Sequence, residues 1–403
     1  MEVMEPPCTK NTKDMAPSRL AMRLGELSHA QLLQIAVAGC EASSEINNLA
    51  DAFFATHKPL PQWAVEGVLL SNDLVPHVLA PLQLEDGAAA AVCSSWADAW
   101  KATSEARRHL RRVAFDIPQD LLGMADYFEL VAISGDTDAE PQLLVRSGGT
   151  VRILARNMCT KRSLFDAAFD RDDSVIAADG QSIYVIVRSG QPLQPGSVTV
   201  RRLAHDGSEL ASYEDHKFPF RGVLARGGYF FCVGQGLDDH DDEILALDAQ
   251  SLQPRYRFGL SLFNGAADIV LIDGSLVVCD TENDRLQVFS LTGEHLCSIT
   301  GEWKRPVGLC FVKDRLYLIE ESQDEDDVDE SEELYEPLRG RRIFVLSLQG
   351  DTLEVFQNPV EGHSFDGTIV YFDGMLLAPF QRTKRRGEEF VAPVVGVMAL
   401  RGV

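Results

Sequence analysis

The sequence lacks the segments that mark membrane and secreted proteins. It contains no run of 18 apolar residues, so no membrane-spanning helix is expected. Its first 25 residues lack the apolar core of a signal peptide. Its eight cysteines form no C-x-x-C pair, and there is no N-x-S/T sequon. We therefore expect free thiols and a location in the cytoplasm or nucleus.

Motifs for common catalytic chemistries are also missing. The sequence has no H-E-x-x-H, G-x-S-x-G, Walker A or G-x-G-x-x-G motif, and Gly234-Gln-Gly236 lacks a third glycine. His240 stands among five acids, but nothing in the sequence fixes a ligand geometry around it. We therefore predict no catalytic residue, no metal and no cofactor, and a protein that is not itself an enzyme.

Positive charge is scarce. The chain has 37 Lys and Arg against 61 Asp and Glu, a formal net charge of −24. This balance disfavours non-specific binding to nucleic acid and suits a basic protein partner. We expect neither a nucleic-acid partner nor a membrane.

The front of the chain has helical periodicity after a tail. Residues 1–25 read as a disordered tail, 26–60 as a helical hairpin, and 61–110 as two short amphipathic helices. The second pair has leucines at helical spacing, an L-E-D link, and then V-C-S-S-W. This stretch resembles an F-box, although Leu70-Ser71 stands where that motif usually opens with Leu-Pro.

An F-box buries its apolar face in a groove of an Skp-type adaptor. The resemblance implies that the adaptor-binding residues here are Leu74, Val78, Leu79, Leu82, Val92 and Trp96. The alternative is an ordinary helical hairpin whose apolar face packs on the rest of this protein.

Residues 111–403 instead show short apolar runs separated by Gly, Asp and Asn. Paired runs recur, and closing leucines at 164, 210, 252, 296 and 353 have intervals of 46, 42, 44 and 57 residues. The long interval contains an acidic insert at 321–336. Six such units predict a β-propeller, since one blade cannot bury both of its faces. The expected fold is multidomain and mainly β: a small N-terminal α-helical region followed by a six-bladed β-propeller.

The fourth unit resembles an NHL repeat through Asp280, Asn283, Arg285 and the L-Q-V-F that follows. We predict that these polar residues satisfy backbone groups in a strand connection, so that Asp280→Ala costs about 1 kcal/mol. The last unit lacks an outer strand. We predict that Arg111–Ile117 supplies it and closes the ring.

Loops between the second and third strands should all emerge on one face of the propeller. We expect partner contacts there from Asp238, Asp239, Asp241, Asp242, Arg385 and Arg386. The alternative is that the acidic loops are simply solvated.

Together the two resemblances imply a substrate-recognition subunit of a cullin-RING (SCF-type) ubiquitin ligase, with an Skp-type adaptor, a cullin and a target protein as partners. One alternative is a non-ligase interaction scaffold on an NHL-type propeller. Another is a propeller hydrolase or lyase with a metal in its central channel, for which Asp173, Asp268 and Asp366 are the only hints.

Overall fold

The structure is a computed structural model, and two compact units make up the chain: Met1–Arg107 and Arg108–Val403. The residues it describes are 74–79, 94–104, 108–115, 117, 128–133, 141–147, 150–165, 175–189, 197–215, 220–234, 242–322, 339–365, 367–382 and 396–403. The predicted tail at 1–25 and hairpin at 26–60 lie outside these residues.

The described part of the first unit consists of two helices, α5 (Val75–Leu79) and α6 (Ser94–Ala102). They pack on each other through Val75, Leu79 and Ala99, which are the buried members of one apolar cluster. None of the helices in the described ranges is long and apolar enough to cross a membrane.

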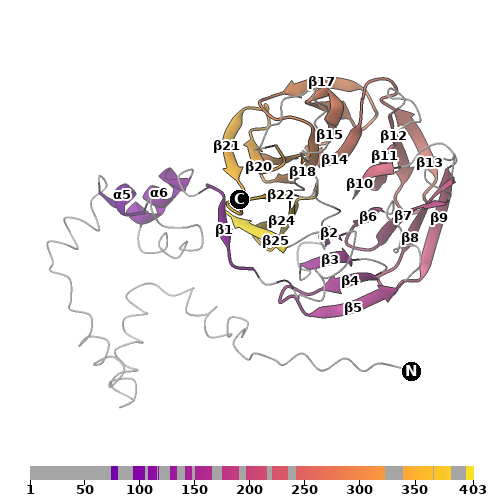
Figure 1. The fold of residues 1–403 in the computed structure, drawn as a ribbon, viewed down its shortest axis with the longest axis horizontal. Helices are drawn as coiled ribbons and strands as arrows, with labels where there is room; N and C mark the ends of the chain where they lie inside the picture. The colour runs from indigo at the N-terminus through magenta and orange to yellow at the C-terminus, as the bar shows by residue number, and fades with distance from the viewer. Residues whose placement is uncertain are drawn as a thin grey trace, which may run out of the picture. The chain divides into compact units, whose positions relative to one another are not determined.

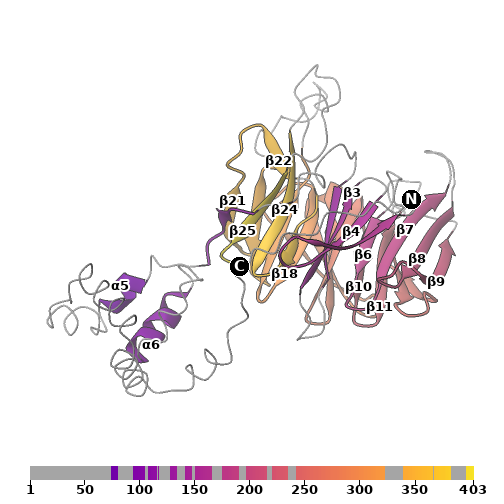
Figure 2. The same cartoon turned by 90° about the horizontal axis from the view of Figure 1, so that it is seen from below.

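The second unit is a six-bladed β-propeller. Six antiparallel sheets follow one another around a ring (Figure 1), and Figure 2 shows their strands side-on. Blade one is β2 (Phe128–Ile133), β3 (Gln142–Ser147), β4 (Thr150–Leu154) and β5 (Thr160–Phe165). Blade two is β6 (Val175–Ala178), β7 (Ile183–Ser189), β8 (Ser197–Leu203) and β9 (Glu209–Asp215). Blade three is β10 (Phe220–Arg226), β11 (Tyr229–Gly234), β12 (Glu243–Asp248) and β13 (Pro254–Phe258).

Blades four and five repeat this order. Blade four is β14 (Ala266–Ile272), β15 (Ser275–Asp280), β16 (Arg285–Ser290) and β17 (His295–Thr300), with the 3-10 turn η4 (Thr281–Asn283) between β15 and β16. Blade five is β18 (Pro306–Val312), β19 (Arg315–Glu320), β20 (Arg342–Leu346) and β21 (Thr352–Gln357).

Blade six differs at both edges. Its inner position is divided into β22 (His363–Phe365) and β23 (Val370–Phe372), and both pair with β24 (Met375–Arg382). Gly367, at φ +56°, lies in the break. At the other edge, β1 (Arg111–Val113) pairs with β25 (Gly396–Arg401). The predicted closure of the ring by the segment before blade one is therefore confirmed.

The core lies between the blades. Each of six apolar clusters in the described propeller residues joins two neighbouring blades; the one between blades four and five contains Cys279, Trp303 and Phe344. The middle strands are covered on both faces, so β15 and β19 are buried almost throughout. Strands buried on both faces have near-continuous apolar sequences, which is why these runs were visible in the sequence.

One expectation about cysteine is wrong. Cys159 is disulfide-bonded, whereas Cys232, Cys279, Cys297 and Cys310 are free. A disulfide needs two Cα atoms within about 7 Å, and that proximity cannot be read from scattered positions in a sequence.

Candidate functional site

The helix pair divides the predicted adaptor-binding residues into two kinds. Leu79 is fully buried in the pair's own cluster, whereas Leu74 is 42% exposed and Trp96 packs against the cluster while keeping part of its surface accessible. The side chain of Val78, together with Leu82 and Val92, lies outside the described residues. Leu79 is therefore part of the interior, and Leu74 and Trp96 are the described residues that a partner could reach.

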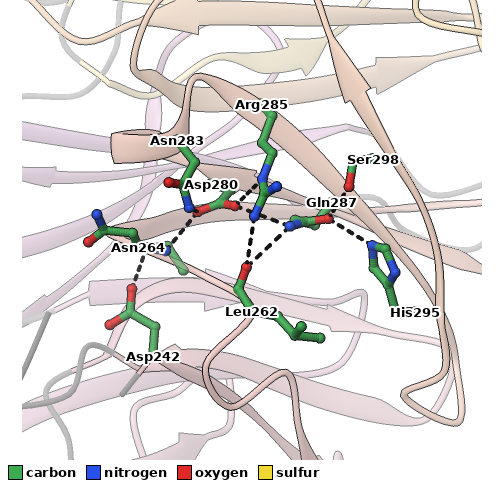
Figure 3. A network of polar contacts seen from close by, with 10 residues as sticks. Asp242, Leu262, Asn264, Asp280, Asn283, Arg285, Gln287, His295 and Ser298 are labelled. Carbon is green, nitrogen blue, oxygen red and sulfur yellow. Dashed lines mark hydrogen bonds and ion pairs between the residues drawn. The ribbon is translucent and has the colours of Figure 1, made fainter. Parts of the chain in front are cut away.

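Asp280 is the centre of a polar network at the end of β15 (Figure 3). Its carboxylate is completely buried. One oxygen accepts the backbone N–H of Asn264 at 2.7 Å and the Asn283 amide at 2.9 Å. The other accepts Arg285 Nε at 2.6 Å and Gln287 Nε2 at 3.2 Å. The predicted structural role of Asp280, Asn283 and Arg285 is thus confirmed.

The same network fixes the loop that enters blade four. Arg285 and Gln287 both donate to the carbonyl of Leu262, each at 3.2 Å. Phe263 is buried against Phe289, while Leu260 and Leu262 are 57% and 41% exposed. The loop therefore presents two leucines to solvent from a backbone that is held in place.

Ion pairs fix the connection between β17 and β18. Asp284, in the left-handed region at φ +52°, accepts the backbone N–H of Arg305 at 2.7 Å and pairs with Lys304 at 2.9 Å. Arg305 in turn forms ion pairs with Glu282 and Glu321. These contacts join the loops of blades four and five on the face where second and third strands connect.

Blade five contains an equivalent carboxylate that sequence reasoning missed. Glu320, fully buried at the end of β19, accepts Arg342 Nε at 2.8 Å and Nη2 at 2.7 Å. It also accepts the backbone N–H of Lys304 at 2.8 Å. The two partners are separated by the long acidic insert, of which the structure describes only Glu321 and Ser322.

Asp242 is not a surface residue as the sequence suggested. It is 1% exposed, and its carboxylate accepts the backbone N–H of Ala266 at 2.7 Å. It therefore ties the loop of blade three to the first strand of blade four. The other residues predicted for partner contacts, Asp238, Asp239, Asp241, Arg385 and Arg386, lie outside the described residues.

A central channel of about 1120 Å³ runs between the innermost strands. Glu129 and Asp268 line it, and burial raises the pKa of Glu129 to about 7 and that of Asp268 to about 6. Asp173 and Asp366 lie outside the described residues. Within the part of the chain that is described, no group of three or more His, Cys, Asp or Glu could hold a metal ion.

No known family matches the sequence, and no curated protein matches it either. The fold is similar to solved structures at low sequence identity. The RRP9 WD40 repeats are 10% identical, covering 72% of this chain and 97% of that chain with a TM-score of 0.45. The WD40 β-propeller domain of Doa1 is 10% identical, covering 68% and 78% with a TM-score of 0.44. BamB from Moraxella catarrhalis is 14% identical, covering 72% and 99% with a TM-score of 0.41. These likenesses concern the fold alone.

Proposed function

We propose that this chain is a protein-interaction receptor of the SCF type. In this proposal the F-box-like helices bind an Skp-type adaptor, which recruits a cullin, and the propeller binds a target protein for ubiquitination. The chain would make no bonds itself, because holding a target near a ubiquitin conjugate raises the effective concentration of the reactants.

The observation that supports the adaptor step is the helix pair's own core. Val75, Leu79 and Ala99 are buried within one cluster, while Leu74 and Trp96 retain accessible surface. A tryptophan with accessible surface is typical of the residues that dominate interfaces, and apolar residues on a helix face anchor helix-in-groove binding.

Co-purification of the full-length chain with an Skp-type adaptor tests this step. Leu74→Glu places a charge on exposed surface without opening the helix core, so we expect at least tenfold weaker binding, which corresponds to about 1.4 kcal/mol. Leu210→Glu is the matched control, because Leu210 is 49% exposed on β9 of the propeller. Trp96→Ala should also weaken binding, with circular dichroism confirming that the helices remain.

Two results would show that the adaptor step is wrong. One is that the unmodified chain does not bind the adaptor, and the other is that Leu74→Glu and Leu210→Glu bind equally well.

A second candidate, an interaction scaffold outside the ligase system, is favoured by the loop of blade four. Leu260 and Leu262 are exposed on a backbone fixed by Arg285 and Gln287. Rigid apolar anchors lose little conformational entropy when they bind. If the adaptor does not bind, the exposed pair Leu260 and Leu262 is a candidate surface for a protein contact.

A further inference from the structure

Two carboxylates occupy equivalent positions on opposite walls of the central channel. Glu129 of β2 lies opposite Arg146, the residue before the last of β3. Asp268 lies in a bulge of β14 opposite Cys279, the residue before the last of β15. Because β2 belongs to blade one and β14 to blade four of a six-bladed ring, the two strands that carry these residues lie on opposite sides of the channel (Figure 1).

Both carboxylates are held in fixed orientations by the next blade. Glu129 accepts the backbone N–H of Ile176, with each oxygen at 3.2 Å. Asp268 accepts the N–H of Leu309 at 2.8 Å with one oxygen and that of Ile269 at 2.8 Å with the other. Each oxygen of Asp268 has two lone pairs, so both retain acceptor capacity that these bonds do not use.

The two carboxylates differ in their counter-charge. Arg146 pairs with Glu129 at 3.2 Å, whereas none of the described residues forms an ion pair with Asp268. Burial raises the pKa of both groups, and the charge of Asp268 raises that of Glu129 further. A cation beside Asp268 would therefore offset the desolvation cost of its charged carboxylate, which no ion pair with a described residue offsets.

Among the residues that the structure describes, the basic ones that line the channel are Arg202, Arg226 and Lys313. Arg202 donates to the Ser182 hydroxyl and the Gln250 carbonyl, and Lys313 donates to the Val403 carbonyl. Lys313 is four residues beyond Leu309, about 13 Å along the strand direction. The carboxylates and this lysine are therefore separated along the channel.

The rest of the channel wall is mixed: Asp179, Gln181 and Thr368 line it together with apolar side chains. Half-buried side chains from several inner strands line it: Val131, Val175, Leu224, Val270, Val307 and Tyr371. Small-molecule sites usually combine such apolar side chains with a few convergent polar groups.

We propose that the channel binds a small organic cation, whose ammonium group pairs with Asp268 and faces Glu129, and whose apolar part contacts the inner strands. A hard metal ion such as calcium requires about six to eight oxygen ligands, and two opposed carboxylates, each already holding backbone N–H groups, do not supply such a set. This site is separate from the surfaces used in the proposed receptor function.

Isothermal titration of the full-length chain with phenethylamine at pH 8 tests the proposal, and 2-phenylethanol is the neutral comparator. We expect the amine to bind with a Kd of about 1 mM or lower, which corresponds to about −4 kcal/mol, and the alcohol to show no binding. Asp268→Asn should weaken amine binding at least tenfold. Asp273→Asn is the matched control, because Asp273 lies exposed in the turn after β14 of the same blade.

A second variant covers the case in which Asp268→Asn does not fold. Val131→Lys on β2, two residues from Glu129 on the same face of the strand, places an ammonium group inside the channel and should also weaken amine binding at least tenfold. Four outcomes would overturn the proposal: no amine binding at 10 mM, equal binding of the alcohol, full binding by both channel variants, or displacement of the amine by calcium chloride at lower concentration.

Discussion

Replacing Asp280 by alanine should destabilise the propeller strongly. The carboxylate is completely buried and accepts four hydrogen bonds. Its removal leaves the N–H of Asn264 and the amide of Gln287, which is 2% exposed, without this acceptor. Each buried donor left unsatisfied costs about 1–3 kcal/mol. Because Arg285 is one-third exposed, water can solvate its freed guanidinium. The loss of its hydrogen bond to Asp280 therefore adds less to the destabilisation.

The expected destabilisation is therefore about 3–5 kcal/mol, within the range for breaking a buried charged pair. The sequence alone suggested about 1 kcal/mol, because it indicated a local turn contact rather than a four-donor network. Urea unfolding of the full-length chain, followed by circular dichroism and by tryptophan fluorescence, measures this change. Trp303, fully buried between blades four and five, reports on the affected region.

Two variants make the measurement specific. Asp351→Ala removes an exposed carboxylate with one long hydrogen bond of 3.3 Å to Ser347, and should change stability by less than about 0.5 kcal/mol. Asp280→Asn keeps one oxygen acceptor, so its loss of stability should lie between those of Asp280→Ala and Asp351→Ala. A loss below about 1 kcal/mol for Asp280→Ala would refute the reasoning, because it would mean that the network contributes no more than an ordinary turn.

Three further predictions concern closure, packing and pH. Val113→Pro removes a backbone N–H from β1, which pairs with β25, and should cost about 3 kcal/mol in urea unfolding, whereas Val113→Ala should cost less. Gly308→Ala should prevent or severely weaken folding, since its Cβ would lie 2.1 Å from the Gly367 carbonyl oxygen; normal thermal stability would contradict the packing. The folded-state pKa of Asp268 is raised to about 6 from 3.8, so its contribution to stability is complete below the unfolded pKa and is lost as pH rises through 6. Relative to Asp268→Asn, the unmodified chain should therefore gain about 1 kcal/mol between pH 8 and pH 5, and equal slopes would contradict the assignment.

The blades could be predicted because their middle strands are buried on both faces. β15 and β19 form apolar runs that recur around the ring, and the missing outer strand of blade six followed from counting strands. The division of the inner strand of blade six into β22 and β23 could not be predicted. The sequence at 367–373, GTIVYFD, is a continuous apolar run like those of the other buried strands, and nothing in it marks where the strand is interrupted.

The burial of Asp242 could not be predicted from the sequence either. It stands in an acidic stretch typical of solvated loops, yet it is 1% exposed because it accepts the N–H of Ala266 from the next blade. Composition describes the average environment of a segment. A single buried carboxylate within it depends on a donor 24 residues away, which only the fold brings near.

Blades four and five each have a carboxylate at the end of the second strand that makes the same contacts. Asp280 ends β15 and accepts the N–H of Asn264, two residues before β14 begins. Glu320 ends β19 and accepts the N–H of Lys304, two residues before β18 begins.

In both blades an arginine that starts the third strand pairs with that carboxylate. The pair therefore fixes the entry of the chain into the inner strand. The intervening loop can have any length, because neither hydrogen bond depends on it. A search for a carboxylate at the end of one strand and an arginine at the start of the next, with free spacing, would have found blade five, where the fixed spacing of Asp280, Asn283 and Arg285 did not.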